Sequence, residues 1–427
     1  MDVMVRPSGM PAESGQEPMA DGPVAAPFMR LSSKLRDDLY EEVRHDKTWH
    51  QRLTWSRGEW TPGSLTSLAS RFERSLRWNK VKPEKENFDS PRPTIQSQSI
   101  CREHLTGTAP EFLSEETLRI LTEAVGSAQI KEAVIDMECW ERTFLNSEGC
   151  SVTTQGKWFD FYASYNTGAA LVRWRDGTST QEEVSRLARP PLPILGRGVT
   201  WSEPRTIDTV RYDLVLLSPT ASSVVIHELI GHGCEHFREK IVGLRVGPEE
   251  LRVVAFPKNG SGFDDEGTPS EEIVLVENGI VRHAVRDRAT GGMAPFSGLT
   301  KVASHGVKPG SRCTHLKAEG ESSQEGVTGV PAERTVWIEH FSAANYHSGR
   351  AFFRSGLAWV GSREELLYPL MPFTMSIDIY ELASLLWHLD GQTERARSGL
   401  CNKDGEFLPT FNFAPKIALR PVVSIRP

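Results

Sequence analysis

The sequence predicts an α+β protein of two domains. Its 427 residues exceed the about 100–200 residues of a typical domain. Short β-type runs between turn residues fill much of the chain, and helical periodicity is confined to a few segments. A proline- and glycine-rich stretch near residues 190–205 marks a boundary. We therefore expect a flexible leader (1–30), an N-terminal α/β domain with an antiparallel sheet (31–200) and a β-rich C-terminal domain (201–427).

Four stretches of the first half predict helices. Serines at the start of the first stretch are suited to cap its free amides. The second stretch repeats apolar residues at a 3.6-residue period, and the third has acidic residues in its first turn. In chain order these helices are predicted over Leu31–Arg44, Gly63–Trp78, Ser114–Val125 and Thr178–Ala188.

Between these helices the chain predicts an antiparallel meander. Its β-type runs are Ala133–Trp140, Trp158–Tyr165 and Ala170–Trp174. The runs are broken by turn chemistry at Asn146–Gly149 and at Asp176–Gly177. Short β-rich runs that alternate with such turns are typical of neighbouring antiparallel strands.

The second half is mostly strand-like. A strand is predicted over Tyr212–Leu217 and a helix from Ala221 to Phe237. Asn278-Gly279 between two apolar runs (273–277 and 280–285) predicts a hairpin, because this dipeptide favours a tight turn with positive φ. A last helix is predicted over Ile377–Leu389, before a C-terminal stretch of mixed strand character.

Composition narrows the function classes. The formal net charge of −7 and the pI near 6.0 provide no basic field for nucleic acid or anionic lipid. No run of about 18 apolar residues occurs, so no membrane span is expected. Six scattered cysteines do not form a disulfide framework, and residues 1–30 lack the pattern of a secretory signal. The expectation is a cytoplasmic protein without nucleic-acid or membrane partners.

A segment near the middle of the chain concentrates groups that bind metals. His227, Glu228 and His232 lie on the predicted helix in a His-Glu-x-x-x-His pattern. Zinc helices usually space their two histidines four residues apart, which places both on one face. At five residues apart, the imidazoles of a regular α-helix point about 140° away from each other. A π-bulge would restore the alignment, and Gly231 makes such a distortion or a close backbone approach easier.

This pattern alone does not establish a metal site. It occurs by chance in many chains, and its histidines are equally compatible with partly buried polar or surface roles. Catalytic zinc takes three protein ligands, so a third donor has to come from elsewhere. Cys234 lies about 200° round the helix from His232 and is expected to be a small buried apolar residue. Glu235 shares the face of His232 and is a candidate acceptor for an imidazole N–H.

Several segments together resemble the TldD/PmbA family of metallopeptidases. Residues 224–236 are similar to the family's His-Glu-x-x-x-His helix, including a Gly before the second His and a Glu three residues after it. Ser398–Gly405 resembles the family's metal-binding cysteine loop. The other similar segments are Asn146–Gly149, Tyr212–Pro219, Phe263–Pro269 and Val274–Val281. The resemblance covers about residues 130–427 and is that of a TldD-like, metal-bearing chain.

The resemblance implies a fold, a metal and a reaction. The fold is the two-domain TldD/PmbA-like architecture, with the metallopeptidase helix in the C-terminal domain. The metal is zinc, held by His227, His232 and Cys401, with Glu228 as the general base that moves a proton from water to the leaving amine. The reaction is hydrolysis of an amide bond in an unstructured peptide held as an added strand. The expected partner is a second copy or a TldD/PmbA paralogue, giving a homodimer or heterodimer.

Three departures from the family pattern bear on the substrate. Asn402 follows Cys401 where the family usually has Gly, the segment after Thr290 lacks the family's usual Asn-Gly-Arg, and residues 1–100 align poorly. They favour an unusual substrate, such as a small peptide-like intermediate of natural-product biosynthesis. Two alternatives stay open, a non-catalytic partner subunit and a structural protein whose His-Glu helix is coincidental. The sequence does not specify the substrate, the choice between endo- and exo-hydrolysis, or the group that stabilises the oxyanion.

Overall fold

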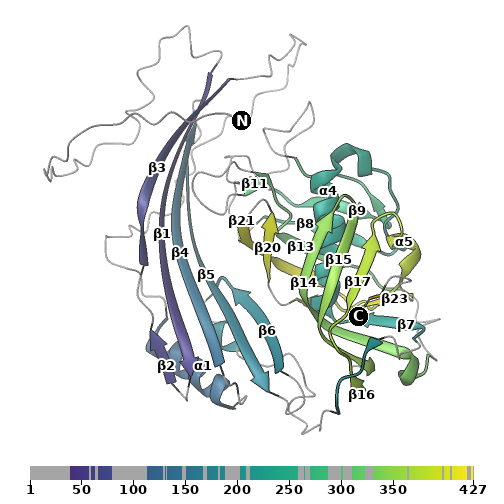
Figure 1. The fold of residues 1–427 in the computed structure, drawn as a ribbon. Coiled ribbons are helices and arrows are strands. Elements are labelled where there is room, and N and C mark those ends of the chain that lie inside the picture. The colour runs from purple at the N-terminus through teal and green to yellow at the C-terminus, as the bar shows by residue number, and fades with distance from the viewer. Residues whose placement is uncertain are drawn as a thin grey trace, which may run out of the picture.

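The computed structural model in Figure 1 shows two halves lying side by side, a long curved sheet and a β-rich body around a central helix. The structure describes residues 39–56, 59–62, 66–78, 113–127, 130, 132–146, 151–166, 171–180, 183–187, 202–207, 212–257, 264, 270–286, 300–301, 310–322, 330–362, 365–396, 399–403, 406–420 and 425–426. The predicted leader and the proline-rich boundary at 190–201 lie outside these residues, and the domain limits stay predictions.

The first half is built on an antiparallel sheet of six described strands in the order β2-β1-β4-β5-β6, with β3 paired to the same edge of β1 as β2. The strands are β1 (Leu39–Ser56), β2 (Glu59–Pro62), β3 (Thr66–Trp78), β4 (Glu132–Asn146), β5 (Ser151–Asn166) and β6 (Leu171–Thr178). The predicted antiparallel meander is therefore confirmed in β4, β5 and β6. The prediction of a turn at Asp176–Gly177 is wrong, because both residues continue β6.

One face of this sheet carries the core of the first half. Alternate residues of β4 and β5, among them Ile135, Met137, Phe159 and Phe161, are fully buried. They pack against α1 (Glu115–Ser127) and the short α2 (Val184–Leu187). Helix α1 confirms the helix predicted near Ser114–Val125, whereas the described part of the predicted Thr178–Ala188 helix contains a single helical turn, Val184–Leu187.

Two predicted helices are strands. Residues 39–44 of the Leu31–Arg44 prediction begin β1, and the Gly63–Trp78 prediction is β3 from Thr66 onward. The two strands pair with each other from Leu39 opposite Trp78 to His50 opposite Thr66. A continuous antiparallel partner satisfies the backbone of both segments, so pairing distant in sequence overrides their local helical pattern.

The second half contains two larger sheets. In the described chain the first has eight strands in the order β18-β23-β7-β14-β15-β17-β24, with β16 on β15. Its strands are β7 (Leu214–Leu217), β14 (Thr335–His347), β15 (Arg350–Gly361), β16 (Leu366–Pro369), β17 (Thr374–Asp378), β18 (Leu386–Leu389), β23 (Ile417–Leu419) and β24 (Ile425–Arg426).

The other large sheet has six described strands in the order β10-β9-β8-β13-β22-β19. They are β8 (Arg252–Ala255), β9 (Ile273–Glu277), β10 (Ile280–Val281), β13 (His315–Glu319), β19 (Glu394–Arg395) and β22 (Phe411–Ala414). Two separate hairpins pair β11 (Thr300–Lys301) with β12 (Gly310–Ser311) and β20 (Leu400–Lys403) with β21 (Glu406–Pro409). Short 3-10 turns occupy Arg238–Ile241 and Ala332–Arg334.

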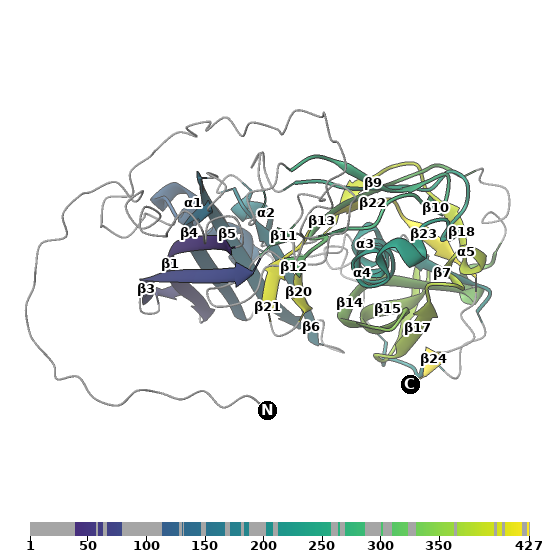
Figure 2. The ribbon, with the colours of Figure 1, turned by 90° about the horizontal axis from the view of Figure 1, so that it is seen from above.

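A distorted helix lies between the two large sheets (Figure 2). It consists of α3 (Pro219–Ile226), a π-helical turn (His227–Gly231) and α4 (His232–His236). Its buried side chains join one hydrophobic cluster with residues of both sheets, such as Leu316 of β13 and Ile338 of β14. Because both faces are covered, the helix is fixed in position and so are the polar groups it carries.

Two further predictions in this half have opposite outcomes. The hairpin at Asn278-Gly279 is confirmed, with φ of 53° and 69° at the two turn residues. The helix predicted over Ile377–Leu389 is wrong: β17 ends at Asp378, one turn of helix (α5, Leu382–Leu385) follows, and β18 begins at Leu386. Within the described residues, no helix is long and apolar enough to cross a membrane.

Candidate metal centre

The central helix begins with a capped turn directly after β7. Ser218 adopts an extended conformation, and its hydroxyl accepts a hydrogen bond from the Ala221 amide at 3.2 Å. The same hydroxyl donates to the Glu339 carbonyl of β14 at 2.5 Å. Pro219 occupies the first turn, where its missing N–H costs no hydrogen bond. The cap thus ties the start of the helix to the neighbouring sheet.

A π-helical turn brings the two histidines to one side of the helix. The His232 amide donates to the His227 carbonyl, five residues earlier, as a π-helix requires. The imidazole ring centroids lie 4.8 Å apart. This confirms the predicted bulge. Gly231 provides close packing, because a Cβ there would lie 3.2 Å from side-chain atoms of Cys313 and Leu316.

Cys401 approaches the helix from the β20–β21 hairpin. It lies opposite Leu408 in the hairpin register, so the predicted cysteine loop is a strand at this position. The base of the hairpin is closed by Gly399 and Thr410, whose hydroxyl both accepts from and donates to the Gly399 backbone. Asn402, the departure from the family pattern, is exposed and lies opposite Phe407 in the hairpin register.

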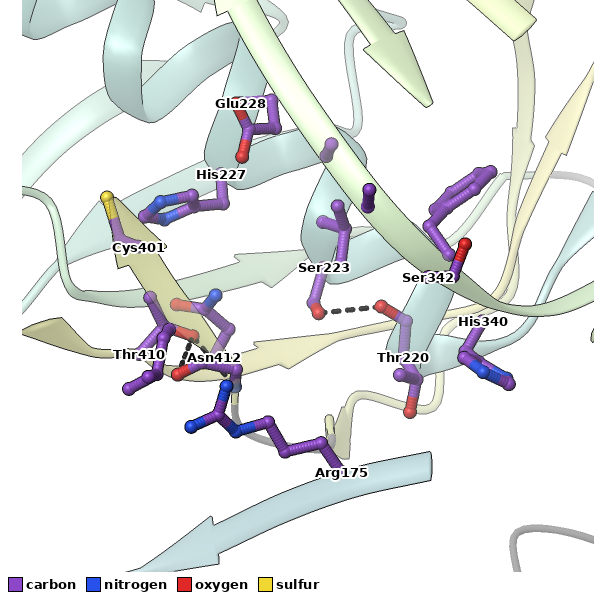
Figure 3. Close-up of a pocket in the computed structure, with 16 residues that line it drawn as sticks. Arg175, Thr220, Ser223, His227, Glu228, His340, Ser342, Cys401, Thr410 and Asn412 are labelled. Atoms are coloured by element: carbon purple, nitrogen blue, oxygen red, sulfur yellow. Dashed lines mark hydrogen bonds between the residues drawn. The ribbon is translucent and has the colours of Figure 1, made fainter. Parts of the chain in front are cut away.

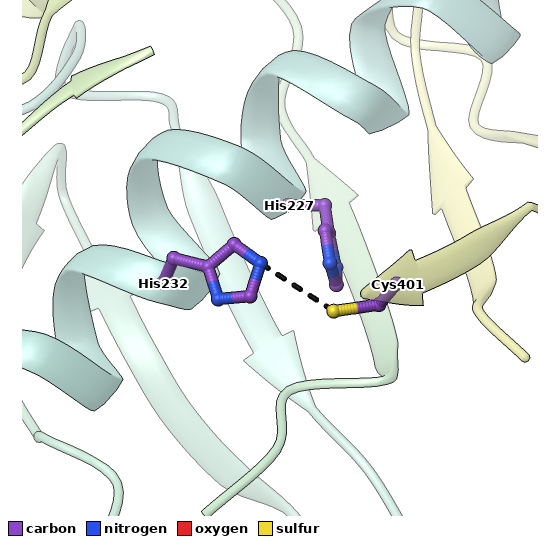
Figure 4. Close-up of side chains that lie close together, drawn as sticks. All are labelled: His227, His232 and Cys401. Carbon is purple, nitrogen blue, oxygen red and sulfur yellow. Dashed lines mark hydrogen bonds between the residues drawn. The ribbon is translucent and has the colours of Figure 1, made fainter. Parts of the chain in front are cut away.

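The structure brings His227, His232 and Cys401 together (Figure 4). One donor atom of each lies within 4.8 Å of the others, and all three residues are buried. The Cys401 Sγ is 3.5 Å from the His232 Nε2. Two imidazole nitrogens and one sulfur at these separations can surround a single metal ion.

The hydrogen bonding of His227 also fits a metal. Both of its ring nitrogens are buried and have no hydrogen-bond partner among the described residues. A buried polar atom without a partner carries a penalty of about 1–3 kcal/mol. A cation bound by His227 would remove this penalty at one of the two nitrogens.

His232 is oriented by a buried carboxylate. Its Nδ1 lies 3.0 Å from Glu235 Oε2, which confirms the predicted contact and leaves Nε2 directed at Cys401. Glu235 also accepts from the Cys313 amide and from Lys403 Nζ, at 2.5 and 2.8 Å. Burial would raise the pKa of Glu235, but His232 and Lys403 outweigh it and hold the carboxylate ionised.

The Cys401 sulfur lies in a positively charged setting. Burial would raise the pKa of its thiol, but the two histidines outweigh burial and lower it to about 6. Arg312, which is buried, points Nη1 at the sulfur from 3.8 Å and donates from Nη2 to the Lys403 carbonyl at 2.7 Å. The site therefore favours a thiolate.

Glu228 lines a cavity of about 230 Å³ beside the three residues (Figure 3). Its carboxylate lies 4.0 Å from His232 Nε2 and is not part of the compact His–His–Cys cluster. The other lining residues come from both halves of the chain: Arg175, Thr220, Ser223, Val224, His227, His340, Phe341, Ser342, Ala343, Ala344, Gly399, Leu400, Cys401, Thr410 and Asn412.

Three charged residues near the site were missed in the sequence. Arg312, Lys403 and Arg175 contact or line it from segments whose arrangement in space the sequence does not reveal. Only Lys403 carried a signal, because it stands two residues after Cys401 in the motif segment. Cys234 is buried with its pKa raised to about 12 by burial, as expected of an apolar role. Most of Phe263–Pro269 lies outside the described residues.

Residues 209–400 match the model of the PmbA/TldA metallopeptidase C-terminal domain. A metalloprotease of Methanothermobacter thermautotrophicus is 26% identical over 316 residues, which is 67% of this chain and 67% of that protein. A metalloprotease TldD homolog of Buchnera aphidicola is 24% identical over 226 residues, 48% of this chain and 46% of the homolog. The match to the latter thus spans about half of that relative's length.

Solved structures with the same fold cover nearly the whole chain. TldE from Thermococcus kodakarensis superposes with a TM-score of 0.59 at 15% identity, over 91% of this chain and 97% of that one. A proposed modulator of a DNA gyrase from Thermotoga maritima gives 0.57 at 16% identity, over 90% and 95%. The chain is thus a β-rich α+β protein with the two-part TldE-like fold. Residues 209–400 are similar to the C-terminal domain of PmbA/TldD metallopeptidases, and the relatives compared carry metalloprotease names at low identity.

Proposed function

We propose that this chain is a zinc-dependent hydrolase that cleaves an amide bond in a peptide or small peptide-like molecule. The observation that carries the proposal is the convergence of His227, His232 and Cys401 within 4.8 Å, beside a cavity that Glu228 also lines. Buried polar groups are costly unless they satisfy one another or a ligand, and both ring nitrogens of His227 have no hydrogen-bond partner among the described residues.

The donor set favours zinc. Two imidazoles and one thiolate are a donor set typical of zinc sites, and His227 and Cys401 of this set also line the cavity. When bound there, zinc would supply Lewis acidity toward water and the amide carbonyl. Glu235 and Arg312 would orient His232 and Cys401 through the contacts described above.

Glu228 is the proposed general base. It follows a proposed ligand in sequence and faces the cavity, so its carboxylate can accept a proton from water and return it to the leaving amine. The side chain is about 13% exposed, enough to contact a substrate while staying near His232. Its distance from the cluster keeps it available for proton transfer.

The substrate backbone would pair with β14. The first residues of β14 lie between β7 and β15, but beyond Ile338 the described chain supplies a strand only on the β15 side. Ser342, Ala343 and Ala344 of this segment line the cavity. An extended peptide could therefore add as a strand and gain backbone hydrogen bonds without a sequence requirement.

Substitution of Glu228 tests the catalytic assignment. The E228Q variant should keep zinc at the wild-type stoichiometry and lose about 10²–10⁴-fold in turnover of a peptide-library substrate. The exposed Glu250 provides the matched control, and E250Q should be unchanged in both. Full turnover by E228Q, or a wild-type protein that binds no zinc, would refute the proposal.

We also propose that the chain works as a dimer with a second copy or a paralogue, and that it carries the metal of the pair. The complete donor set favours this role over that of a non-catalytic partner. Size-exclusion chromatography with light scattering on the isolated chain tests the homodimer. A monomer that gains activity only with an added paralogue would indicate the heterodimer.

A further inference from the structure

A stripe of charged side chains crosses the N-terminal sheet on the face opposite its hydrophobic core. It consists of Arg52, Asp136, Asp160 and Arg175, on β1, β4, β5 and β6. Arg52 stands opposite Asp136 and Asp136 opposite Asp160 in the strand register, and Arg175 lies one diagonal step from Asp160. Each arginine forms a two-pronged ion pair with its aspartate. The stripe thus has an arginine at each end.

Only one of the two arginines reaches the candidate metal site. Arg175 lines the cavity that also contains His227, Glu228 and Cys401, whereas Arg52 is not among its lining residues. Figure 3 shows the Arg175 guanidinium rising from β6 toward Thr410 and Asn412. A residue of the first half therefore forms one wall of a site built by the second half.

The two halves are held together next to this wall. Arg395 of β19 donates to the Gly177 carbonyl at 2.9 Å and to the Glu183 carboxylate at 2.6 Å. Its guanidinium also lies 4.2 Å from the centre of the Phe411 ring. These contacts fix the end of β6 two residues from Arg175. The arginine is thereby held at the cavity by packing between the halves.

Arg175 has hydrogen-bond donors to spare. A guanidinium carries five N–H groups, and Asp160 engages Arg175 only through Nε and Nη2. Nη1 makes no hydrogen bond within the described chain, so the edge formed by Nη1 and the second N–H of Nη2 is available. Asp160 is 12% exposed and locks the guanidinium plane in place. A fixed guanidinium edge matches a carboxylate in a two-pronged arrangement.

Building on the proposed function, we propose that Arg175 binds a carboxylate of the substrate and thereby determines specificity. The preferred substrates would be peptides or peptide-like amides with a free carboxylate close to the cleaved bond, either the C-terminal group or an acidic side chain. The cavity of about 230 Å³ lies below the about 300–1,000 Å³ of drug-sized sites, so only a short segment separates the two groups.

A binding experiment separates this role from a structural one. The protein is zinc-loaded E228Q, which should bind substrate without turnover, and the probe is dansyl-tetraalanine with either a free or an amidated C-terminus. A second pair of amidated probes carries Glu or Gln at the third position. Fluorescence anisotropy measures the affinity of each. Because dansyl has no carboxylate, differences within a pair report the carboxylate alone.

Each variant neutralises both members of one ion pair, so the net charge of the sheet does not change. R175Q/D160N removes the cavity arginine without leaving Asp160 buried and unpaired, and R52Q/D136N makes the same change at the other end of the stripe. We expect R175Q/D160N to lower the affinity for probes with a carboxylate by about tenfold or more. The affinity for amidated, uncharged probes should be unchanged. R52Q/D136N should bind all probes like the parent, and thermal melting reports whether both variants fold. If R175Q/D160N abolishes the affinity difference between the free and amidated C-termini, Arg175 binds the C-terminal carboxylate. If it abolishes the difference between the Glu and Gln probes, Arg175 binds an acidic side chain.

The same variants on the active background separate this inference from the proposed function. For R175Q/D160N we expect a higher KM for carboxylate substrates and an unchanged kcat. The carboxylate role is refuted, and the hydrolase stands, if the wild type hydrolyses the free and amidated probes at equal rates and the Glu and Gln probes at equal rates, and R175Q/D160N does the same. If E228Q shows Arg175-dependent carboxylate binding but the wild type hydrolyses nothing, the carboxylate site stands and the hydrolase fails.

Discussion

The two halves of the molecule use buried polar groups differently. Behind the N-terminal sheet the hydrophobic cluster is accompanied by an ion pair between Arg186 and the buried Asp176, and the Arg52–Asp136 and Arg175–Asp160 pairs lie on the opposite face. In the second half, polar side chains such as His227, Glu235 and Arg312 are buried beside the central helix. Buried polar groups are retained only where they satisfy one another or a ligand. The contrast indicates that the second half combines the larger hydrophobic cluster with the buried polar groups suited to chemistry.

Two buried cysteines, one in each half, differ in the same way in the pKa of their thiols. Cys139 of β4 lies in the apolar core, where burial raises the pKa of its thiol to about 11. Cys401 is also buried, but the neighbouring His227 and His232 outweigh burial and lower its pKa to about 6. The surrounding charges, and not burial itself, therefore decide which thiol can serve as a ligand.

The largest expected effect is loss of metal on replacing Cys401. C401A should weaken zinc binding by more than about a hundredfold, because loss of an outer-shell partner alone costs about 10–100-fold. C139A is the matched control, since it removes a buried thiol from the other half. Metal content by mass spectrometry and competition with a chromogenic chelator measure both. Equal zinc affinity in the two variants would remove Cys401 from the site.

In metal-free protein, the thiols of Cys401 and Cys139 should also differ in reactivity, by up to about a hundredfold. With pKa values of about 6 and 11, the two thiols differ about 10⁴-fold in the fraction that is thiolate at pH 7. A thiolate of lower pKa is intrinsically less nucleophilic, which reduces this difference about a hundredfold. Reaction of Cys401 with dithiodipyridine should therefore be about fiftyfold to a hundredfold faster. Its rate should rise with pH up to about 6–7 and then level off, because the thiolate is then fully formed.

Peptide mapping by mass spectrometry identifies the modified cysteine, and added zinc should protect Cys401. A Cys401 rate that keeps rising to pH 9, parallel to that of Cys139, would contradict the lowered pKa. Protection of Cys139 and not Cys401 by zinc would contradict the site itself.

The next effect concerns the carboxylate behind His232. Glu235 accepts from His232, Cys313 and Lys403, so E235Q should lower zinc affinity by about 10–100-fold without removing a donor. K403M should have a smaller effect in the same direction, because the other two contacts of Glu235 remain. Chelator competition ranks the two variants. If K403M were the more damaging, Lys403 would have a role independent of Glu235.

The sequence was most informative where local chemistry determines structure. The five-residue spacing of His227 and His232 predicted a π-turn, because no regular helix aligns the two rings. Asn278-Gly279 predicted its hairpin for an equally local reason, the positive φ of both residues. Cys401 was reached only through the family resemblance, since nothing local marks a lone cysteine as a ligand.

Failures concentrate where contacts between distant residues decide. The helical periodicity before Trp78 gave way to pairing between β3 and β1. Arg312 lies 89 residues from Cys401, and Arg395 is 218 residues from the Gly177 carbonyl that it binds. Such partners become visible only when the strand order is known. The contact of Glu235 with His232 was thus predictable from the helix, and those of Arg312 and Lys403 were not.

The smallest expected effect tests the structural role of the N-terminal sheet. Gly156 lies opposite Trp140 in the register, and a Cβ at this glycine would come within 2.2 Å of the tryptophan ring. G156A should therefore lower the free energy of unfolding by about 1–3 kcal/mol, because the ring has to move. Gly126, near the end of α1, has open space around it, so G126A should be neutral or stabilising by up to about 1 kcal/mol. Thermal and denaturant melts measure both, and zinc affinity should be unchanged in each. A loss of zinc in G156A would show that the first half supports the metal site as well as the fold.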